Sequence, residues 1–219
     1  MSWRFFSCAA LFITCLLTAN VIAGKLVVIG GIVLAAGIVV FPISYIVADV
    51  LTEVWGYPAT RRVIWLGFAC NVLMVAAMWV GGALPPAPFW KDQAAYEAIL
   101  GQTPRLLLAS FIAYLAGEFA NAFVMAKVKI WTSGRWLWIR TIGSTIVGEG
   151  LDSAIFVTLA FGGTVPSGII GGIVAGQWVV KVLYEVAATP LTYAVVGWLK
   201  SRERLDTFDY DTNFNPARL

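Results

Sequence analysis

Residues 144–153 read STIVGEGLDS, and they place two acidic side chains within a run, residues 138–161, that otherwise suits a membrane-spanning helix. Glu149 and Asp152 are three positions apart, so they lie on one face of that helix. A carboxylate at the centre of a bilayer costs about 2.5–3.5 kcal/mol on insertion scales. Two such groups on one face indicate either a function or a buried partner.

The composition of the whole chain is typical of an integral membrane protein. Of its 219 residues, 60% are hydrophobic and 12% are charged, and the mean hydropathy is +0.83. In a soluble domain about 25% of residues are charged. The chain has 10 Trp and 7 Tyr, and several of them end apolar runs, as in the aromatic belts at membrane surfaces. These values exclude an ordinary soluble domain.

Residue types that carry enzyme chemistry are scarce. The sequence has no His, which excludes histidine acid–base chemistry and imidazole metal ligands. Cys8, Cys15 and Cys70 lie in apolar segments and form neither a metal-binding spacing nor a disulfide framework. No Ser or Cys has a base arranged for nucleophilic catalysis, and no phosphate-binding loop is present. We therefore expect no cofactor, no metal and no enzyme activity.

Six apolar runs predict six membrane-spanning helices, each near the length of about 20 residues that a bilayer core requires. They cover residues 5–24, 37–55, 63–83, 106–126, 138–161 and 169–199. A signal peptide is the alternative for the first run, because Arg4 precedes it, but the run is long and more spans follow. The predicted fold is therefore all-α, with a single six-helix membrane domain over residues 1–200 and a polar, solvent-exposed cytoplasmic tail over residues 201–219.

Three connecting segments and the last span add detail to this pattern. Residues 26–36 are apolar and Gly-rich, and they form either an outer connector or a re-entrant piece. Residues 56–58 (GYP) are turn residues. The long polar loop over residues 84–104 has room for a short helix. The last span is long enough to be tilted, or broken near Pro190.

The basic residues are divided unequally between the two sides that these spans define. Eleven lie on one side: Arg4, Arg61, Arg62, Lys127, Lys129, Arg135, Arg140, Lys200, Arg202, Arg204 and Arg218. Only Lys25, Lys91 and Arg105 lie on the other. Since cytoplasmic loops carry the excess of Lys and Arg, we expect both termini in the cytoplasm of a bacterial cell and the helices in its inner membrane.

Two segments of the chain resemble each other. Residues 44–53 (SYIVADVLTE) and 144–153 (STIVGEGLDS) share the pattern Ser-x-Ile-Val-x-acid-x-Leu, 100 positions apart. A weaker echo pairs Ala-Asn at residues 19–20 with Ala-Asn at residues 120–121. The two halves would cross the membrane in opposite directions, as a 3+3 inverted repeat, which is typical of transporters. Chance recurrence of short apolar words is the alternative.

Polar side chains recur at helical spacing inside four of the spans. These are Asp49 with Glu53, Glu118 with Asn121, Glu149 with Asp152, and Gln177 with Lys181 and Glu185. Such groups must face the interior of the bundle or a water-filled cavity. Asn20, Asn71 and Asn121 suit either interhelical hydrogen bonds or ligand contacts.

Ion pairing accounts for only some of these charges. Lys181 and Glu185 can neutralise each other on their own helix, and Arg61, Arg62 or Arg140 could reach Glu53 from the cytoplasmic edge. Six acids nevertheless face one Lys at membrane depth, and the excess must be protonated, bound to a cation or paired with a donor-rich ligand. The alternative is that the charges only pin helices together. Glycines at Gly148, Gly150, Gly171, Gly172 and Gly176 predict close contacts between helices.

The ordered motifs resemble one known family. They are AN at 19–20 with Lys25, FPISY at 41–45, Asp49, TEVWG at 52–56, RR at 61–62, PR at 104–105 with AS at 109–110, EFAN at 118–121, GEGLDS at 148–153 and KVLYE at 181–185 with Pro190. This set resembles the bacterial queuosine-precursor transporters of the vitamin uptake transporter group. The resemblance covers nearly the whole chain, although Trp55 stands where the family pattern suggests Tyr.

The resemblance implies import of 7-cyano-7-deazaguanine, and of its 7-aminomethyl form, for salvage into transfer RNA modification. A carboxylate accepts from the ring N–H and the exocyclic amine of such a base together, and we assign this role to Glu149 and Asp152. We expect Asp49, Glu118 and Asn121 to lie near the base, and Asn121 or Gln177 to bind its carbonyl group. Tyr45 or Phe119 would stack on the ring of the base. Lys181, Glu185 and Glu53 would form a conformational latch or take part in ion coupling. Proton coupling would use one of the excess acids.

Three other functions stay open. One is a substrate-binding subunit of an ATP-driven uptake complex, although the first span lacks a pair of Ala residues spaced for docking such a partner. The others are an intramembrane enzyme and a purely structural membrane subunit. Small transporters of this size often form homodimers, and a homodimer is the alternative to a monomer here. The basic loop at residues 127–135 indicates topology rather than nucleic-acid binding.

Overall fold

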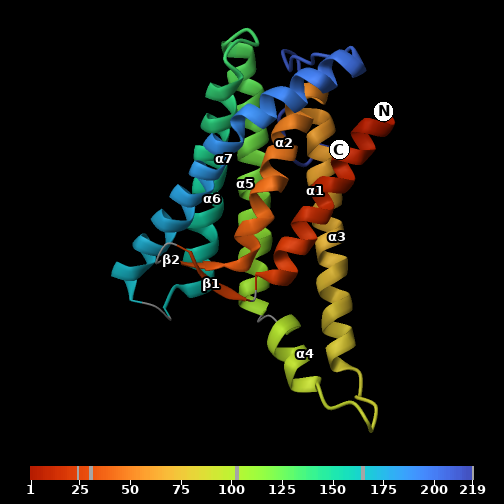
Figure 1. Cartoon of the computed structure of the whole chain (residues 1–219), viewed down its shortest axis with the longest axis vertical. Helices are drawn as coiled ribbons and strands as arrows, with labels where there is room; N and C mark the ends of the chain where they lie inside the picture. The colour runs from red at the N-terminus through yellow and green to blue at the C-terminus, as the bar shows by residue number, and fades with distance from the viewer. Residues whose placement is uncertain (24, 30–31, 102–103, 164–165, 219) are drawn as a thin grey trace.

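The structure, a computed structural model, describes residues 1–23, 25–29, 32–101, 104–163 and 166–218. Its elements are α1 (Trp3–Ile22), β1 (Leu26–Ile29), β2 (Ile32–Ala35), a 3-10 turn η1 (Ala36–Val39), α2 (Phe41–Trp55), α3 (Tyr57–Ala83), α4 (Gln93–Leu100), α5 (Pro104–Trp131), α6 (Leu137–Phe161) and α7 (Ser167–Glu203). The long helices run along the molecule, with the hairpin and α4 toward one end and both termini toward the other (Figure 1).

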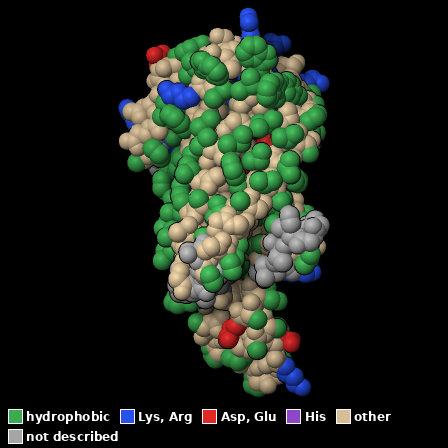
Figure 2. Space-filling model, turned by 90° about the vertical axis from the view of Figure 1, so that its left-hand side faces the viewer, with side chains coloured by type: hydrophobic (Ala, Val, Ile, Leu, Met, Phe, Trp, Pro, Cys, Tyr) green, Lys and Arg blue, Asp and Glu red, His purple; other side chains and the backbone are tan. Residues whose placement is uncertain are grey.

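Five helical stretches in the described part of the chain are long and apolar enough to cross a membrane. They are Trp3–Ile22, Tyr57–Ala83, Pro104–Trp131, Leu137–Phe161 and Gly168–Glu203. Side chains such as Leu73, Leu108 and Leu183 point away from the protein. Hydrophobic groups cover much of the middle of the face seen in Figure 2. This is a multi-pass membrane protein.

The predicted second span differs from the other five. Helix α2 has only 15 residues, which gives a length of about 22 Å, whereas a bilayer core is about 30 Å thick. The four residues of η1 before it form a 3-10 turn. A sixth span, and with it the 3+3 inverted repeat, therefore stays a prediction.

The expectation of a mainly helical protein is confirmed, with one exception. Residues 26–36 contain an antiparallel hairpin in which Leu26 pairs with Ala35 and Ile29 with Ile32. The β-branched side chains of this segment favour strands. Residues 30–31, at the tip, lie outside the described residues.

The short helix expected in the polar loop is confirmed as α4. It is held against the end of α3, because Tyr96 Oη donates to the Met78 carbonyl at 3.1 Å and Gln93 Nε2 donates to the Gly82 carbonyl at 3.0 Å.

Helix ends differ from the predicted ones where proline and charged residues lie. Helix α3 begins at Tyr57 rather than at residue 63, because Pro58 suits the first turn of a helix. Only Gly56, with φ of +81°, separates α3 from α2. Helix α7 continues through Pro190 to Glu203, so it is not broken there. Helix α5 extends to Trp131 and takes up part of the basic loop.

The tail after α7 is not simply exposed to solvent, which corrects our expectation. Asp209 is only 3% exposed, and its Oδ2 accepts from the backbone N–H of Tyr57 at 3.0 Å. The Phe214 ring lies 4.9 Å from that of Tyr57. Arg61 donates to the carbonyls of Asn213 and Asn215. A helix start carries free N–H groups, and the tail supplies an acceptor for one of them.

We expect Asp209→Ala to lower the free energy of unfolding by about 0.5–2 kcal/mol, the usual cost of losing an N-terminal helix cap. Thermal unfolding of the purified protein in detergent measures the change. Asp211→Ala is the matched control, because Asp211 is exposed on the same tail. Equal stability of the two variants would contradict the capping role of Asp209.

Two glycines allow α5 and α6 to cross closely. A Cβ atom at Gly148 would lie 2.8 Å from Asn121 Cβ and 2.9 Å from the Gly117 carbonyl oxygen. The predicted close contact at Gly148 is therefore confirmed. The same prediction is wrong for three glycines of α7, because a Cβ atom there would meet no described atom within 4 Å. These are Gly171, Gly172 and Gly176.

We expect Gly148→Ala to destabilise the protein by about 1–3 kcal/mol, the usual cost of overfilling a well-packed contact. Gly143→Ala, on the same helix and facing open space, should be neutral or slightly stabilising because Ala favours helix over Gly. Thermal unfolding of both variants checks this, and a Gly148→Ala protein as stable as the Gly143→Ala protein would refute the close crossing.

Candidate functional site

One ammonium group holds the two acids of the 144–153 stretch. Lys181 Nζ on α7 lies 2.5 Å from Glu149 Oε2 and 2.7 Å from Asp152 Oδ2, both on α6. All three side chains are nearly buried. The predicted pair of Lys181 with Glu185 on the same helix does not form. The two carboxylates of Glu149 and Asp152, one turn apart on α6, attract the Lys181 ammonium more strongly than the single carboxylate of Glu185 on α7.

A pocket of about 140 Å³ lies against this ion pair. Its polar lining includes Asp152, Gln177 and Lys181, three of the predicted site residues. Phe41 and Phe156 supply aromatic walls, and Ala35 of the hairpin also lines it. Lys181 Nζ lies 4.8 Å from the centre of the Phe41 ring. The pocket therefore combines charge, an amide and aromatic faces.

A deeper layer holds three more predicted residues. Asn121 Nδ2 donates to Asp49 Oδ1 at 2.7 Å, and Ser144 Oγ approaches the same carboxylate at 3.4 Å. A Cβ at Gly117 would lie 2.8 Å from Tyr45 Oη and 2.9 Å from Asp152 Cβ, so Tyr45 reaches the back of the ion pair. This layer does not line the pocket.

Glu118 also belongs to this layer and is fully buried on α5. Neither of its carboxylate oxygens has a hydrogen-bond partner among the described residues. The other acids near it have a cationic or hydrogen-bond partner. Glu118 is therefore the least compensated acid of the group.

Two of the predicted residues lie outside this arrangement. The ring of Phe119 lies 5.8 Å from that of Trp65, within the hydrophobic core. Glu185 is buried on α7, and one of its carboxylate oxygens has no hydrogen-bond partner in the described parts of the chain. Neither residue lines the pocket.

Glu53 belongs to a separate ion cluster at the end where the termini lie. Arg140 donates to both of its carboxylate oxygens, at 2.7 and 2.8 Å. Lys129 Nζ is 3.4 Å away, and Lys200 contacts the same group. Of the three arginines proposed as partners, Arg140 is the one that binds Glu53. Glu53 therefore does not add to the excess of acids near the pocket.

Asp206 joins this cluster from the tail, 2.6 Å from Lys129 Nζ and 2.8 Å from Lys200 Nζ. Partial burial raises the pKa of Asp206, but hydrogen bonds from the two lysines outweigh this and hold that pKa below its ordinary value. The tail thus takes part in neutralising the charges at this end.

Several lining residues were not predicted. Phe156 follows Asp152 by one helical turn, so the i, i+4 spacing could have indicated it. Phe41 was noted only as part of a motif. Leu34 and Ala35 lie near the pocket because residues 26–35 form a hairpin. No sequence pattern that we recognised predicted that placement.

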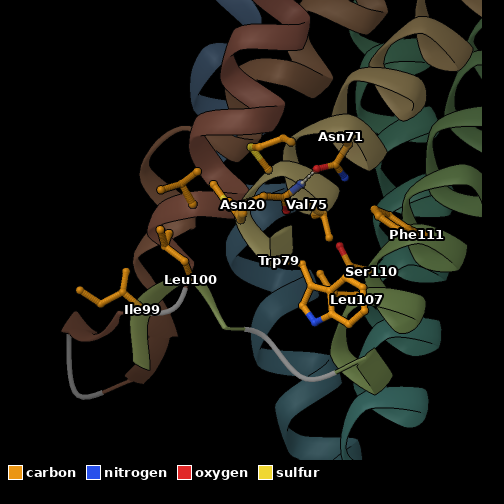
Figure 3. Close-up of a pocket in the computed structure, with 12 residues that line it drawn as sticks. Asn20, Asn71, Val75, Trp79, Ile99, Leu100, Leu107, Ser110 and Phe111 are labelled. Carbon is orange, nitrogen blue, oxygen red and sulfur yellow. Dashed lines mark hydrogen bonds between the residues drawn. The ribbon is translucent and has the colours of Figure 1, made fainter. Parts of the chain in front are cut away.

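A second pocket adjoins the first between α1, α3, α4 and α5 (Figure 3). Asn20 and Ser110 line both pockets. Asn20 Nδ2 donates to Asn71 Oδ1 at 3.0 Å, which confirms the interhelical bonding suggested for these amides. Trp79 and Phe111 form apolar walls of this pocket.

Comparison with known proteins shows which sequences this chain is similar to. Residues 35–195 match the model of the family described as "Putative vitamin uptake transporter". A protein of Bacillus subtilis (strain 168) named "Probable queuosine precursor transporter" is 29% identical over 187 residues, which are 85% of this chain and 82% of that protein. The "Queuosine precursor transporter" of Escherichia coli (strain K12) is 27% identical over 121 residues, 55% of this chain and 52% of that protein.

No solved structure matches the chain. The family match spans most of the sequence and contains the acids of both layers of the site. The family consists of transporters rather than enzymes, which confirms the expectation that this is not an enzyme. The chain therefore belongs to the vitamin uptake transporter family.

Proposed function

We propose that the protein imports queuosine precursors, 7-cyano-7-deazaguanine and its 7-aminomethyl form, across the bacterial inner membrane as a secondary-type transporter. The names of the two relatives support this class of substrate. The observation that carries the proposal is the ion pair of Lys181 with Glu149 and Asp152 beside a pocket with aromatic walls.

The chemistry of the site suits a flat base with several donors. Its ring N–H and exocyclic amine can both donate to a carboxylate, and charge-assisted bonds of this kind are strong. The base would take over acceptors that Lys181 occupies in its absence, first on Asp152, which lines the pocket, and then on Glu149, which does not line it but shares the same ammonium. Phe41 and Phe156 line the pocket and are better placed to stack on the ring than Tyr45 and Phe119. Gln177 can read the carbonyl.

The orientation that we propose places both termini in the cytoplasm, because eleven of the basic residues lie on that side of the spans. The proposed inverted repeat is supported by a shared detail. Ser44 Oγ donates to the Phe41 carbonyl at 2.6 Å, and its counterpart Ser144 donates to the Thr141 carbonyl at 2.9 Å.

Uptake in bacteria that neither make nor import the precursors tests the function. We expect this gene alone to restore accumulation of labelled 7-cyano-7-deazaguanine. Glu149→Gln and Asp152→Asn should each reduce it strongly, whereas Glu97→Gln, on exposed α4, should not. Uptake that appears only with an added ATPase complex would favour the ATP-driven alternative. Full uptake by both site variants would disprove the site.

A further inference from the structure

We propose that Glu118 binds the proton that is transported together with the substrate. This inference rests on the proposed function and assigns the coupling ion and its binding residue. It starts from a buried carboxyl group whose two oxygens have no hydrogen-bond partner among the described residues.

The donors nearest to Glu118 along α5 are already engaged elsewhere. Tyr114, one turn before it, donates its hydroxyl to the Ile64 carbonyl at 2.9 Å. Asn121, three residues after it, donates to Asp49 at 2.7 Å. A charged Glu118 would therefore lie in the protein interior without a donor, and an uncompensated buried charge costs several kcal/mol. Glu118 is accordingly neutral, and holds a proton, in this conformation.

The electrostatic surroundings favour the same state. The charged and titratable groups that interact with Glu118 are Tyr45 and Asp49 on α2, Tyr114 on α5, Glu149 and Asp152 on α6, and Lys181 on α7. The single cation, Lys181, is already in contact with two carboxylates. A negative charge on Glu118 would be repelled by three acids, so its proton is released only when the surroundings change.

The other acids of the membrane part are less suited to this role. Glu149 and Asp152 contact Lys181, Asp49 accepts from two side chains, and Glu53 contacts three cations. Glu185 leaves one buried carboxylate oxygen without a hydrogen-bond partner among the described residues, whereas Glu118 leaves both. Glu118 therefore combines a neutral resting state with a place close enough to the ion pair of Lys181 with Glu149 and Asp152 to interact with its charges. The step is a simple one: its carboxylate takes a proton from the outer side and later gives that proton to the cytoplasm.

This assignment makes uptake of the uncharged cyano base electrogenic, because one proton enters with each neutral molecule. At one-to-one coupling, an inward pH gradient of one unit supports about tenfold accumulation of the base. Purified protein in liposomes can be tested for this uphill accumulation, and also for exchange of labelled against unlabelled base without a gradient.

We expect the wild-type protein to perform both reactions. Glu118→Gln mimics the protonated carboxyl, so it should retain exchange and lose accumulation down to the equilibrium level. Glu97→Gln serves as the control and should retain both. Accumulation by Glu118→Gln at the wild-type level would overturn the proposal, and so would accumulation that follows a sodium gradient at fixed pH.

An infrared measurement separates this proposal from the proposed function. A protonated carboxyl has a C=O stretching band, and the wild-type protein without substrate should show a component of this band that Glu118→Gln lacks. If Glu118→Gln does not fold, Glu118→Asp should shift the band. If the wild-type protein neither accumulates nor exchanges the base, the proposed function fails, and this band alone decides whether Glu118 holds a proton. An unchanged band in both variants would overturn the assignment.

Discussion

Lys181→Met is expected to lower the free energy of unfolding by about 3–5 kcal/mol and to abolish uptake. Lys181 contacts Glu149 and Asp152, and these buried acids would lose their cation. Breaking a buried ion pair by removing one partner typically costs this much, since the remaining charge is uncompensated. Thermal unfolding in detergent and uptake in cells measure the two effects.

A triple variant separates stability from function. Lys181→Met combined with Glu149→Gln and Asp152→Asn removes the whole charge cluster, and replacing a complete buried ion pair is often neutral for stability. We expect this variant to regain most of the lost stability but no uptake. Recovery of uptake would show that the acids do not bind substrate, and a single variant as stable as the wild type would show that the ion pair is not formed.

Glu53→Gln should also destabilise the protein by about 3–5 kcal/mol. Glu53 is fully buried and contacts Arg140, Lys129 and Lys200. Without its charge, Lys129 and Lys200 would keep Asp206 as their one acidic partner among the described residues, and Arg140 would keep none there. Thermal unfolding measures the loss, and an unfolding temperature equal to that of the wild type would contradict the role of Glu53 as the centre of this cluster.

Asp206→Asn provides the comparison within the same cluster. The Asp206 side chain is 48% exposed, so solvent screens its ion pairs and we expect a much smaller loss than for Glu53→Gln. The pKa of Asp206 is lowered in the folded protein. Its contribution is therefore present at neutral pH and is lost as the pH falls through that lowered pKa. Asp206→Asn should flatten this part of the acid unfolding profile.

Much of the fold follows from the lengths of the apolar runs in the sequence. The helices α1, α3, α5, α6 and α7 were all expected from the sequence, because an apolar run long enough for a bilayer has few other stable conformations. The hairpin was not, since eight paired residues give a weak local signal. The place of Asp209 was also beyond prediction, because its partner, the N–H of Tyr57, lies 152 positions earlier in the chain.

The sequence predicted many of the residues in the candidate site, but not which of them form ion pairs with each other. Helical spacing placed Glu149 and Asp152 on one face, and the structure brings Lys181 to that face from another helix. Spacing alone favoured Glu185 as the partner because it lies on the same helix. We grouped Glu53 with the deeper acids because a sequence indicates how deep a residue lies in the membrane only to within about one helical turn. Its contacts with Arg140 and Lys200 place it in a separate cluster.

Direct binding of 7-cyano-7-deazaguanine to the purified protein tests the central claim, that the carboxylates beside Lys181 accept the donors of the base. Calorimetry should detect binding to the wild-type protein, and binding of an analogue without the exocyclic amine should be weaker by about 1–3 kcal/mol, the cost of a buried acceptor left unpaired. Glu149→Gln and Asp152→Asn should each weaken binding of the base. Equal affinity of the wild-type protein and both variants for the base would contradict the account.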